Sequence, residues 1–479
     1  MNNKAYIPEE FISSVAAILP RTLDINDFIR HCQTPLRKSI RINTLKISVN
    51  DFIHKMTAEG WLFDPIPWCQ EGFWLERPDI QEQTLPLGNT AEHLAGLFYI
   101  QEASSMLPPV ALIGDNPQPG KILDMAAAPG SKSTQLAGLM SNRGLLIANE
   151  FSSSRIKVLS ANLQRCGVVN CAMTHFDGSI FGNWTPETFD CILLDAPCSG
   201  EGTIRKDPDA MKNWSVESIQ AIASTQKKLI ESAFIALKPG GTLVYSTCTM
   251  NLQENQHICL HLQQRFAEAV EFISLANLFD GAEQAVTEQG FLHIWPQLFD
   301  SEGFFVAKIA KKSSVDYCYQ GKALNNFPFS KVTRKQRDEL ERYVQQQFGW
   351  SLPDDLLLYQ RDNQYWLFPA PVEDLIGKLR LQRIGLKLAE QHKHGFKFTH
   401  EGALAYGQQF SKNLFELTPS QFGEYYHGRD IRWPLNQNSG EALVCYQGYP
   451  VGLVKALKGK LKNNLPRDLV KDGQLVSWE

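Results

Sequence analysis

The sequence has no run of about 18 uncharged apolar residues, the length that a membrane-spanning helix needs. Its beginning also differs from a signal peptide, because Glu9 and Glu10 stand where basic residues and then an apolar run would be. The hydrophobic fraction, 43%, is that of a globular protein. We therefore expect a cytoplasmic protein with no membrane partner.

The cysteines lack the CxxC spacing of most structural zinc sites, although the chain has 10 of them. The closest pair, Cys166 and Cys171, does not belong to a zinc pattern with histidine. We expect reduced thiols and no metal ion. Most cysteines, such as Cys191 in FDCILLDA, are interpreted as small core residues.

The net charge of −4 hides an asymmetry along the 479 residues, a length that predicts several domains. From Lys311 onward, lysine and arginine outnumber aspartate and glutamate, whereas the chain before it is acidic. A basic C-terminal third fits contact with nucleic acid, and chance segregation of surface charge is the alternative.

Short apolar segments alternate with helical patterns in the middle of the chain. KILDMA, GLLIANE, CAMTHFD, FDCILLDA and TLVYSTC read as strands, and the segments between them as helices. FDCILLDA is almost uniformly apolar, which is typical of a strand covered on both faces. The alternation predicts an α/β, Rossmann-like domain with a parallel sheet, whose ligands bind at the carboxyl ends of the strands.

The domain organisation follows from changes in this pattern. We expect an N-terminal α+β region over 1–95, a catalytic domain over 96–312, a connecting α/β region over 313–383 and a small, mostly β domain over 384–479. In the connecting region, SKVTRKQRDELERYVQQQFGW predicts a charged helix. LLLYQRDNQYWLFP predicts a hairpin about Asp362 and Asn363.

The junction LDMAAAPGSKS joins a predicted strand to a helix, and it matches neither GxGxxG nor a phosphate loop. Small residues with Gly130 let the backbone approach a ligand closely, and Pro129 stiffens the turn. Such a loop suits a nucleoside with a cationic sulfur, S-adenosyl-L-methionine, although an ordinary strand-to-helix turn is the alternative.

Carboxylates stand at the same edge of the predicted sheet. Asp124 is placed to accept hydrogen bonds inside the junction. Glu150 ends the next strand, where it can accept from the ribose hydroxyls, and Asp177 ends the third, where it can accept from the adenine amino group. Together these positions favour a nucleoside site over ordinary surface acids.

Two thiols and a carboxylate end two strands that should be neighbours: Asp195 and Cys198 in DAPC, and Cys248 in STC. A thiolate that adds to C6 of cytosine makes C5 nucleophilic towards a methyl donor. A carboxylate beside N3 stabilises the added state, and the target base must leave any stack to reach the site. From the residues alone, Cys198 and Cys248 are equally good nucleophiles, since DNA cytosine-C5 methyltransferases use a Pro-Cys cysteine.

Five motifs together resemble the NOL/NOP/Sun family of RNA cytosine-C5 methyltransferases. They are RKSIRINTLK, YIQEASSMLP, DMAAAPGSKS, LLDAPCSGEGTIRKDP and YSTCTMNLQENQ, and they cover about residues 35 to 310. The C-terminal module resembles a PUA-type RNA-binding domain. The sequence departs from many members at Ala126, where they have cysteine, and at Leu252, where they have proline.

The resemblance implies a role for each thiol, with Cys248 as the nucleophile and Cys198 assisting release of the covalent intermediate. It places S-adenosyl-L-methionine against Ala126, Ala127, Ala128, Pro129, Gly130, Ser131, Lys132, Glu150, Asp177 and Asp195. The implied substrate is a cytosine in the decoding region of 16S rRNA, in the small ribosomal subunit, and no DNA. The alternatives are a tRNA or another rRNA, an exocyclic-amine methyltransferase, and a non-catalytic RNA-binding assembly factor.

Further side chains are candidates for RNA contact. Arg205 and Lys206 are predicted to meet phosphate near the pocket, with salt bridges to Asp207 or Asp209 as the alternative. A second phosphate-binding group, for which a solvated helix face is the alternative, consists of Lys455, Lys458, Lys460, Lys462, Arg467 and Lys471. Tyr425 and Tyr426 are candidates for base stacking or for the core.

Overall fold

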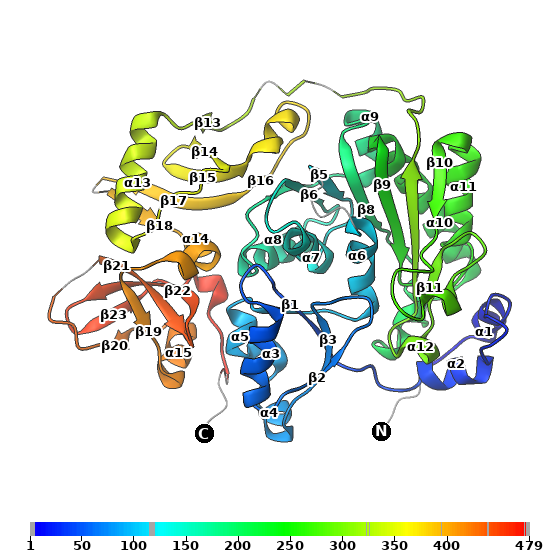
Figure 1. Ribbon diagram of the computed structural model, residues 1–479, viewed down its shortest axis with the longest axis horizontal. Helices are drawn as coiled ribbons and strands as arrows, with labels where there is room; N and C mark the ends of the chain where they lie inside the picture. The colour runs from blue at the N-terminus through cyan, green and yellow to red at the C-terminus, as the bar shows by residue number, and fades with distance from the viewer. Residues whose placement is uncertain are drawn as a thin grey trace.

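The computed structural model describes residues 5–114, 120–321, 323–324, 326–393, 395–437, 440–473 and 475. The strands of these residues form four sheets, and helices pack beside them (Figure 1). Figure 1 shows the largest sheet on the right, the N-terminal sheet below its centre and the two C-terminal sheets on the left.

The largest sheet has nine strands in the order β10-β12-β9-β8-β5-β6-β7-β16, with β11 paired to β12. Its parallel centre consists of β5 (Lys121–Asp124), β6 (Leu145–Asn149), β7 (Cys171–Thr174), β8 (Phe189–Asp195) and β9 (Leu237–Thr247). The antiparallel members are β10 (Val270–Ile273), β11 (Leu292–Ile294), β12 (Phe304–Lys311) and β16 (Arg383–Ile384). The predicted Rossmann-like sheet is thereby confirmed, and its strand order reverses between β5 and β8, where such sheets bind ligands.

Helices cover both faces of this sheet. One face packs against α6 (Leu107–Ile113), α7 (Ser131–Leu139) and α8 (Arg155–Arg165). The other packs against α9 (Phe181–Trp184), α10 (Val216–Ala236) and α11 (Gln256–Phe266). A capping box of Ser215 and Ser218 starts α10, whose apolar residues Ile230, Ala233 and Phe234 are fully buried.

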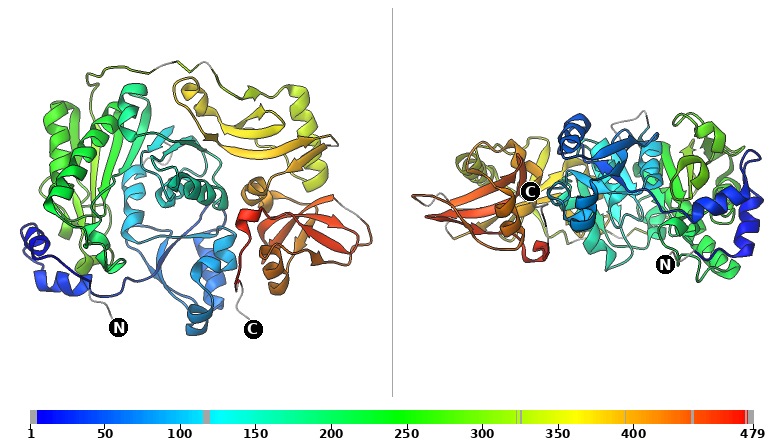
Figure 2. Two further views of the ribbon diagram at one scale, coloured as in Figure 1. Left: turned by 180° about the vertical axis from the view of Figure 1, so that it is seen from behind. Right: turned by 90° about the horizontal axis from the view of Figure 1, so that it is seen from below.

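The N-terminal part forms the sheet β2-β3-β1-β4, built from β2 (Leu62–Pro65), β3 (Gly72–Glu76), β1 (Ser39–Ile42) and β4 (Phe98–Ile100). Its helices are α3 (Val49–Ala58), α4 (Asp79–Thr84) and α5 (Ala91–Leu94). The first two helices, α1 (Glu9–Ala16) and α2 (Ile25–Cys32), lie apart from this sheet and pack near α12 (Pro296–Phe299) (Figure 2).

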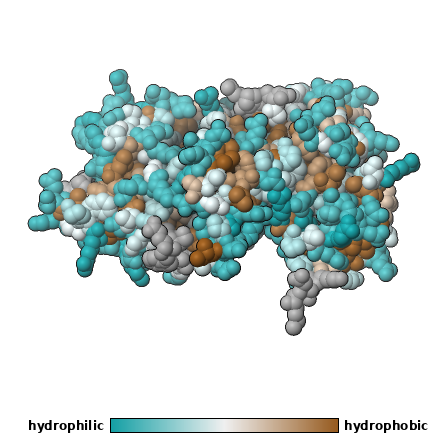
Figure 3. Space-filling model, turned by 60° about the horizontal axis from the view of Figure 1, so that its bottom comes forward, coloured by the Kyte–Doolittle hydropathy of each residue, from teal (hydrophilic) through white to brown (hydrophobic). Residues whose placement is uncertain are grey.

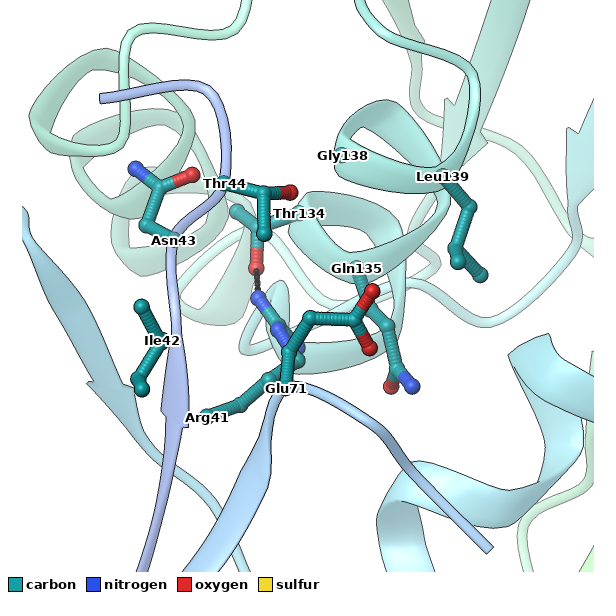
Figure 4. Close-up of a pocket in the computed structure, with 9 residues that line it drawn as sticks. All are labelled: Arg41, Ile42, Asn43, Thr44, Glu71, Thr134, Gln135, Gly138 and Leu139. Carbon is teal, nitrogen blue, oxygen red and sulfur yellow. Dashed lines mark hydrogen bonds between the residues drawn. The ribbon is translucent and has the colours of Figure 1, made fainter. Parts of the chain in front are cut away.

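Arg41 of β1 fixes the N-terminal sheet to the central domain. Its guanidinium donates to the Ser131 carbonyl at 2.7 Å and to Thr134 Oγ1 at 2.8 Å, and its side chain points towards α7 (Figure 4). Because Arg41 is 4% exposed, both bonds are shielded from water. The basic N-terminal motif therefore holds the first turn of α7 in place.

The C-terminal part has two further sheets. The first contains β13 (Ser330–Lys331), β14 (Leu356–Arg361), β15 (Gln364–Pro369), β17 (Leu386–His392) and β18 (Gly395–Phe398), with α13 (Arg334–Phe348) beside it. The second contains β19 (Leu414–Glu416), β20 (Ile431–Arg432), β21 (Gly440–Tyr446), β22 (Tyr449–Leu457) and β23 (Lys460–Asn463), with α14 (His400–Tyr406) and α15 (Pro419–Tyr426). The predicted charged helix and the hairpin turning at Asp362, which has φ 55°, are confirmed.

The surface seen in Figure 3 is mainly hydrophilic, with hydrophobic residues scattered over it. Among the residues that the structure describes, we find no helix whose length and apolar character would let it cross a membrane.

Candidate active site

The junction between β5 and α7 is a tight turn of small residues at the sheet's switch point. Gly130 has φ +109°, and a Cβ atom at this position would lie 3.1 Å from Leu159 Cδ1 on α8. The backbone conformation therefore favours glycine, and the approach of α8 leaves little room for a side chain. Ala127 and Ala128 are buried, and the peptide bond between Ala128 and Pro129 is cis.

Two buried carboxylates support this loop. Asp124 Oδ2 accepts from Ser133 Oγ at 2.6 Å, whereas Asp124 Oδ1 is buried and has no hydrogen-bond partner. Burial raises the pKa of Asp124 to about 7. Glu150 accepts from the Ala128 amide at 3.2 Å and from the Ser152 amide at 2.7 Å, so it holds the loop against the end of β6.

Asp177 differs from the other acids because it is exposed. Its side chain caps the turn that follows β7 and accepts from the Ser179 amide at 2.9 Å. The structure therefore places Asp177 at the expected strand end, with part of its hydrogen-bonding capacity used locally.

Lys132 links the loop to the end of β8. Its Nζ atom donates to Asp195 Oδ2 at 2.7 Å and to Ser105 Oγ at 2.9 Å. Burial alone would lower the pKa of Lys132, but the attraction of Asp195 holds it above its ordinary value. Asp195 Oδ1 accepts from Ser246 Oγ at 2.7 Å, so the carboxylate is fixed from both sides.

The two thiols predicted to face one pocket do lie together. Cys198 Sγ and Cys248 Sγ are 3.2 Å apart, and both residues are partly exposed. The contact with Cys248 and burial raise the pKa of the Cys198 thiol well above its ordinary value, and the charges of Glu254 and Asp195 add to this shift. Cys198 therefore keeps its proton at neutral pH.

Two buried acids that the sequence did not predict, Glu201 and Glu254, lie beside the thiols and are 1% and 0% exposed. Both occur inside motifs quoted above, CSGEGT and NLQENQ. No local pattern separates a buried glutamate from a solvated one in a polar loop, so only the contacts reveal them.

The expectation that Arg205 contacts RNA phosphate is wrong. Its side chain is 2% exposed and donates to Asp300 at 2.8 Å and to backbone carbonyls, including that of Pro35 at 2.9 Å. Its partner is thus neither Asp207 nor Asp209. Lys206, in contrast, is 67% exposed and remains a candidate.

In the C-terminal part, the tyrosines belong to the core. Tyr425 is 0% and Tyr426 is 4% exposed, so neither offers a face to a base. The basic group is largely on the surface: Lys455 and Lys462 are exposed and face each other across β22 and β23. Lys460 is exposed too, and pairs with Asp430 at 2.7 Å.

Four family descriptions match successive parts of the chain. Residues 112–310 match "16S rRNA methyltransferase RsmB/F", and residues 7–103 match the N-terminal domain of 16S rRNA methyltransferase RsmF. Residues 329–406 match the pre-PUA domain of ribosomal RNA small subunit methyltransferase F, and residues 412–471 match the RsmF PUA domain.

Similar proteins extend over the whole length. A Vibrio cholerae protein named ribosomal RNA small subunit methyltransferase F is 54% identical over 99% of this chain and 100% of its own. An Escherichia coli protein of the same name is 53% identical over 98% of both chains.

Solved structures resemble part of this chain. A methyltransferase homologue from Pyrococcus horikoshii is 34% identical, with a TM-score of 0.52, and covers 64% of this chain and 100% of its own. The Pyrococcus horikoshii NSun6 structure with SFG supports the fold alone, at 23% identity and a TM-score of 0.55 over 64% of this chain and 99% of its own. The full-length likenesses and the arrangement of Asp195, Cys198 and Cys248 lead to one conclusion: the chain belongs to the RsmB/F family of 16S rRNA methyltransferases.

Proposed function

We propose that this RNA methyltransferase transfers a methyl group from S-adenosyl-L-methionine to C5 of one cytosine in the decoding region of 16S rRNA, through a covalent bond between Cys248 and C6. The observation that carries the proposal is the 3.2 Å separation of Cys198 Sγ and Cys248 Sγ beside Asp195. An exocyclic-amine methyltransferase has no use for two adjacent thiols.

The residues around the β5–α7 junction fit the methyl donor. Asp124 Oδ1 is buried and unpartnered, so it can accept a hydrogen bond from a ligand in the loop. Glu150 and Asp177 stand at the next two strand ends, where they are assigned to the ribose hydroxyls and the adenine amino group. When bound, S-adenosyl-L-methionine supplies a methyl group on a cationic sulfur.

The two thiols receive different roles. Cys198, whose pKa is raised well above its ordinary value, keeps its proton, and its Sγ atom lies 3.2 Å from Cys248 Sγ. In the proposed mechanism the thiolate of Cys248 adds to C6 of the cytosine, which makes C5 a carbon nucleophile. C5 takes the methyl group from the cationic sulfur of the donor, and a base then removes the C5 proton. The C6–S bond breaks, its electron pair returns to Cys248 Sγ, and Cys198 assists this release.

In this mechanism Asp195 contacts the cytosine ring, and Lys132 orients Asp195. Asp195 is assigned to N3, where it stabilises the proton that the added state carries. Lys132, fixed at 2.7 Å, keeps the Asp195 carboxyl oriented and supplies a compensating positive charge. Both groups are held before the substrate arrives, so little rearrangement is needed during the reaction.

The relatives' names direct the substrate proposal to the small ribosomal subunit. Lys206 near the site and the exposed pair Lys455 and Lys462 are proposed to contact phosphate. The PUA domain match over residues 412–471 supports this use of the C-terminal surface.

The decisive experiment traps the covalent intermediate. Wild type, Cys198→Ala and Cys248→Ala are mixed with S-adenosyl-L-methionine and small subunits lacking the modification, and protein–RNA adducts are separated on a denaturing gel. Cys318→Ser is the matched control, because Cys318 is exposed and far from the site in sequence. We expect the adduct to accumulate in Cys198→Ala and to be missing in Cys248→Ala.

Other outcomes select the alternatives. The reverse adduct pattern would make Cys198 the nucleophile. Methyl transfer that survives in both variants without any adduct would favour an amine target. Methylation of naked tRNA or of another rRNA in preference to the subunit would change the substrate. Binding of RNA without any binding of S-adenosyl-L-methionine would favour an assembly factor.

A further inference from the structure

The two cysteine-bearing loops are joined by a pair of buried glutamates, each of which binds the opposite loop. We name residues 196–205 the first cysteine loop and residues 248–255 the second. Glu254 of the second loop accepts from the Ser199 amide at 2.9 Å and from Ser199 Oγ at 2.5 Å. Glu201 of the first loop accepts from Thr249 Oγ1 at 2.5 Å and from the Met250 amide at 3.0 Å.

Each carboxylate is also fixed within its surroundings. Glu254 accepts from Asn251 Nδ2 at 2.7 Å and from Gln226 Nε2 at 3.0 Å, and Gln226 belongs to α10. Glu201 accepts from Trp214 Nε1 at 2.7 Å. All of these partners are neutral donors, so both carboxylates accept several hydrogen bonds here without forming an ion pair.

The two glutamates bind residues that lie next to the two thiols in the sequence. Ser199 directly follows Cys198, and Thr249 directly follows Cys248, so both carboxylates hold the residue next to a thiol. The Gly202 amide also donates to the Cys248 carbonyl at 2.9 Å. A shift of either loop would therefore change the distance between the two sulfur atoms.

We propose that Glu201 and Glu254 are positioning residues that form a reciprocal clamp, which sets the separation of the Cys198 and Cys248 thiols for covalent catalysis on the RNA base. The role in catalysis rests on the function proposed above. In that mechanism the thiols act on one ring, and a misplacement of about 1 Å can cost ~100-fold in rate.

The first test measures the thiols without RNA. A bifunctional reagent, dibromobimane, becomes fluorescent when it joins two neighbouring thiols, and it is applied to full-length protein carrying Cys318→Ser. In Glu254→Gln and Glu201→Gln we expect cross-linking to slow ~10-fold, because proximity sets the rate of such reactions. Alkylation of Cys248 by a small monofunctional reagent should change much less.

The second test separates positioning from stability. Both variants should lose kcat while KM for the small subunit stays within about threefold, since the clamp does not touch the RNA. Glu401→Gln is the matched control, because Glu401 is a buried acid, 7% exposed, that pairs with Arg383 instead of either cysteine loop. It should retain wild-type kcat and cross-linking.

A milder variant covers the case in which loss of a buried carboxylate prevents folding. Ser199→Ala removes the hydroxyl that donates to Glu254 and contacts Thr249 Oγ1 at 2.9 Å, and it keeps the backbone bond to Glu254. We therefore expect a smaller decrease in both kcat and cross-linking. Wild-type values of either quantity in folded Glu254→Gln and Glu201→Gln, or in Ser199→Ala, would overturn the proposal. The adduct experiment tests the proposed function separately, because cross-linking requires neither RNA nor methyl donor.

Discussion

Lys132 Nζ lies 2.7 Å from Asp195 Oδ2, and this ion pair joins the first turn of α7 to the end of β8. It crosses the switch point of the sheet, with the β5–α7 junction on one side and the two thiols on the other. Both side chains are shielded, at 10% and 29% exposure, so the pair is screened less than a surface salt bridge.

Lys132→Met is expected to lower kcat ~100-fold, because it removes the charge that orients the Asp195 carboxyl. Binding of the small subunit, measured by filter retention, should change little. Lys227→Met on the exposed side of α10 is the control and should behave as wild type. Unchanged kcat in Lys132→Met would show that Asp195 does not depend on this ion pair.

Arg205→Ala is expected to reduce stability and Lys206→Ala to reduce RNA binding, although the two residues are adjacent. Loss of Arg205 leaves buried carbonyls without a donor and should lower the free energy of unfolding by ~2–3 kcal/mol. Lys206→Ala should leave stability unchanged and weaken RNA binding. Urea unfolding and a binding assay on both variants check this, and equal destabilisation by the two changes would contradict it.

The double variant Lys455→Glu with Lys462→Glu is expected to weaken binding of the small subunit. The slope of the logarithm of the binding constant against the logarithm of the salt concentration should decrease by the amount that about two phosphate contacts contribute. Binding measured at several salt concentrations gives this slope. Lys227→Glu with Lys228→Glu, which carries the same charge change on exposed positions of α10, should keep the wild-type slope. Similar slopes in both variants would remove this surface from the RNA interface.

Asp124 is expected to make stability depend on pH. Its native pKa is about 7 and its ordinary value is 3.8, so the native state retains a proton that the unfolded state loses. The contribution of Asp124 to stability is therefore full below about pH 4, and it falls by up to ~1 kcal/mol per pH unit as the pH rises towards 7. Urea unfolding of wild type and Asp124→Asn at pH 5, 6, 7 and 8 measures the difference. A difference that does not vary with pH would contradict the prediction.

Local sequence patterns predicted the parallel strands of the central domain and the helices between them. The apolar strand FDCILLDA lies where its pattern placed it, because burial on both faces leaves a strong signal in the sequence. The meeting of Cys198 and Cys248 followed from parallel strands ending at one edge.

Contacts between residues far apart in the chain could not be predicted from local patterns. Arg205 lies in a polar motif that reads as solvent-facing, yet its partners include Pro35 and Asp300, far away in the chain. The burial of Tyr425 similarly depends on β22, through a hydrogen bond to the Leu453 carbonyl at 3.1 Å. The residues next to Arg205 and Tyr425 in the sequence carry no pattern that indicates these contacts. Neither contact was therefore predictable from composition or spacing.

The pairing of β16 with β7 has a consequence for how the protein can be divided. Arg383 and Ile384 come from beyond the connecting helix α13, yet they complete the edge of the central sheet by pairing with Met173 and Ala172. Without them, β7 would be an edge strand with unpaired backbone groups, which can pair with a strand of another molecule. The C-terminal half thus covers the outer edge of β7, and a cut after β12 is expected to expose the backbone groups of that edge.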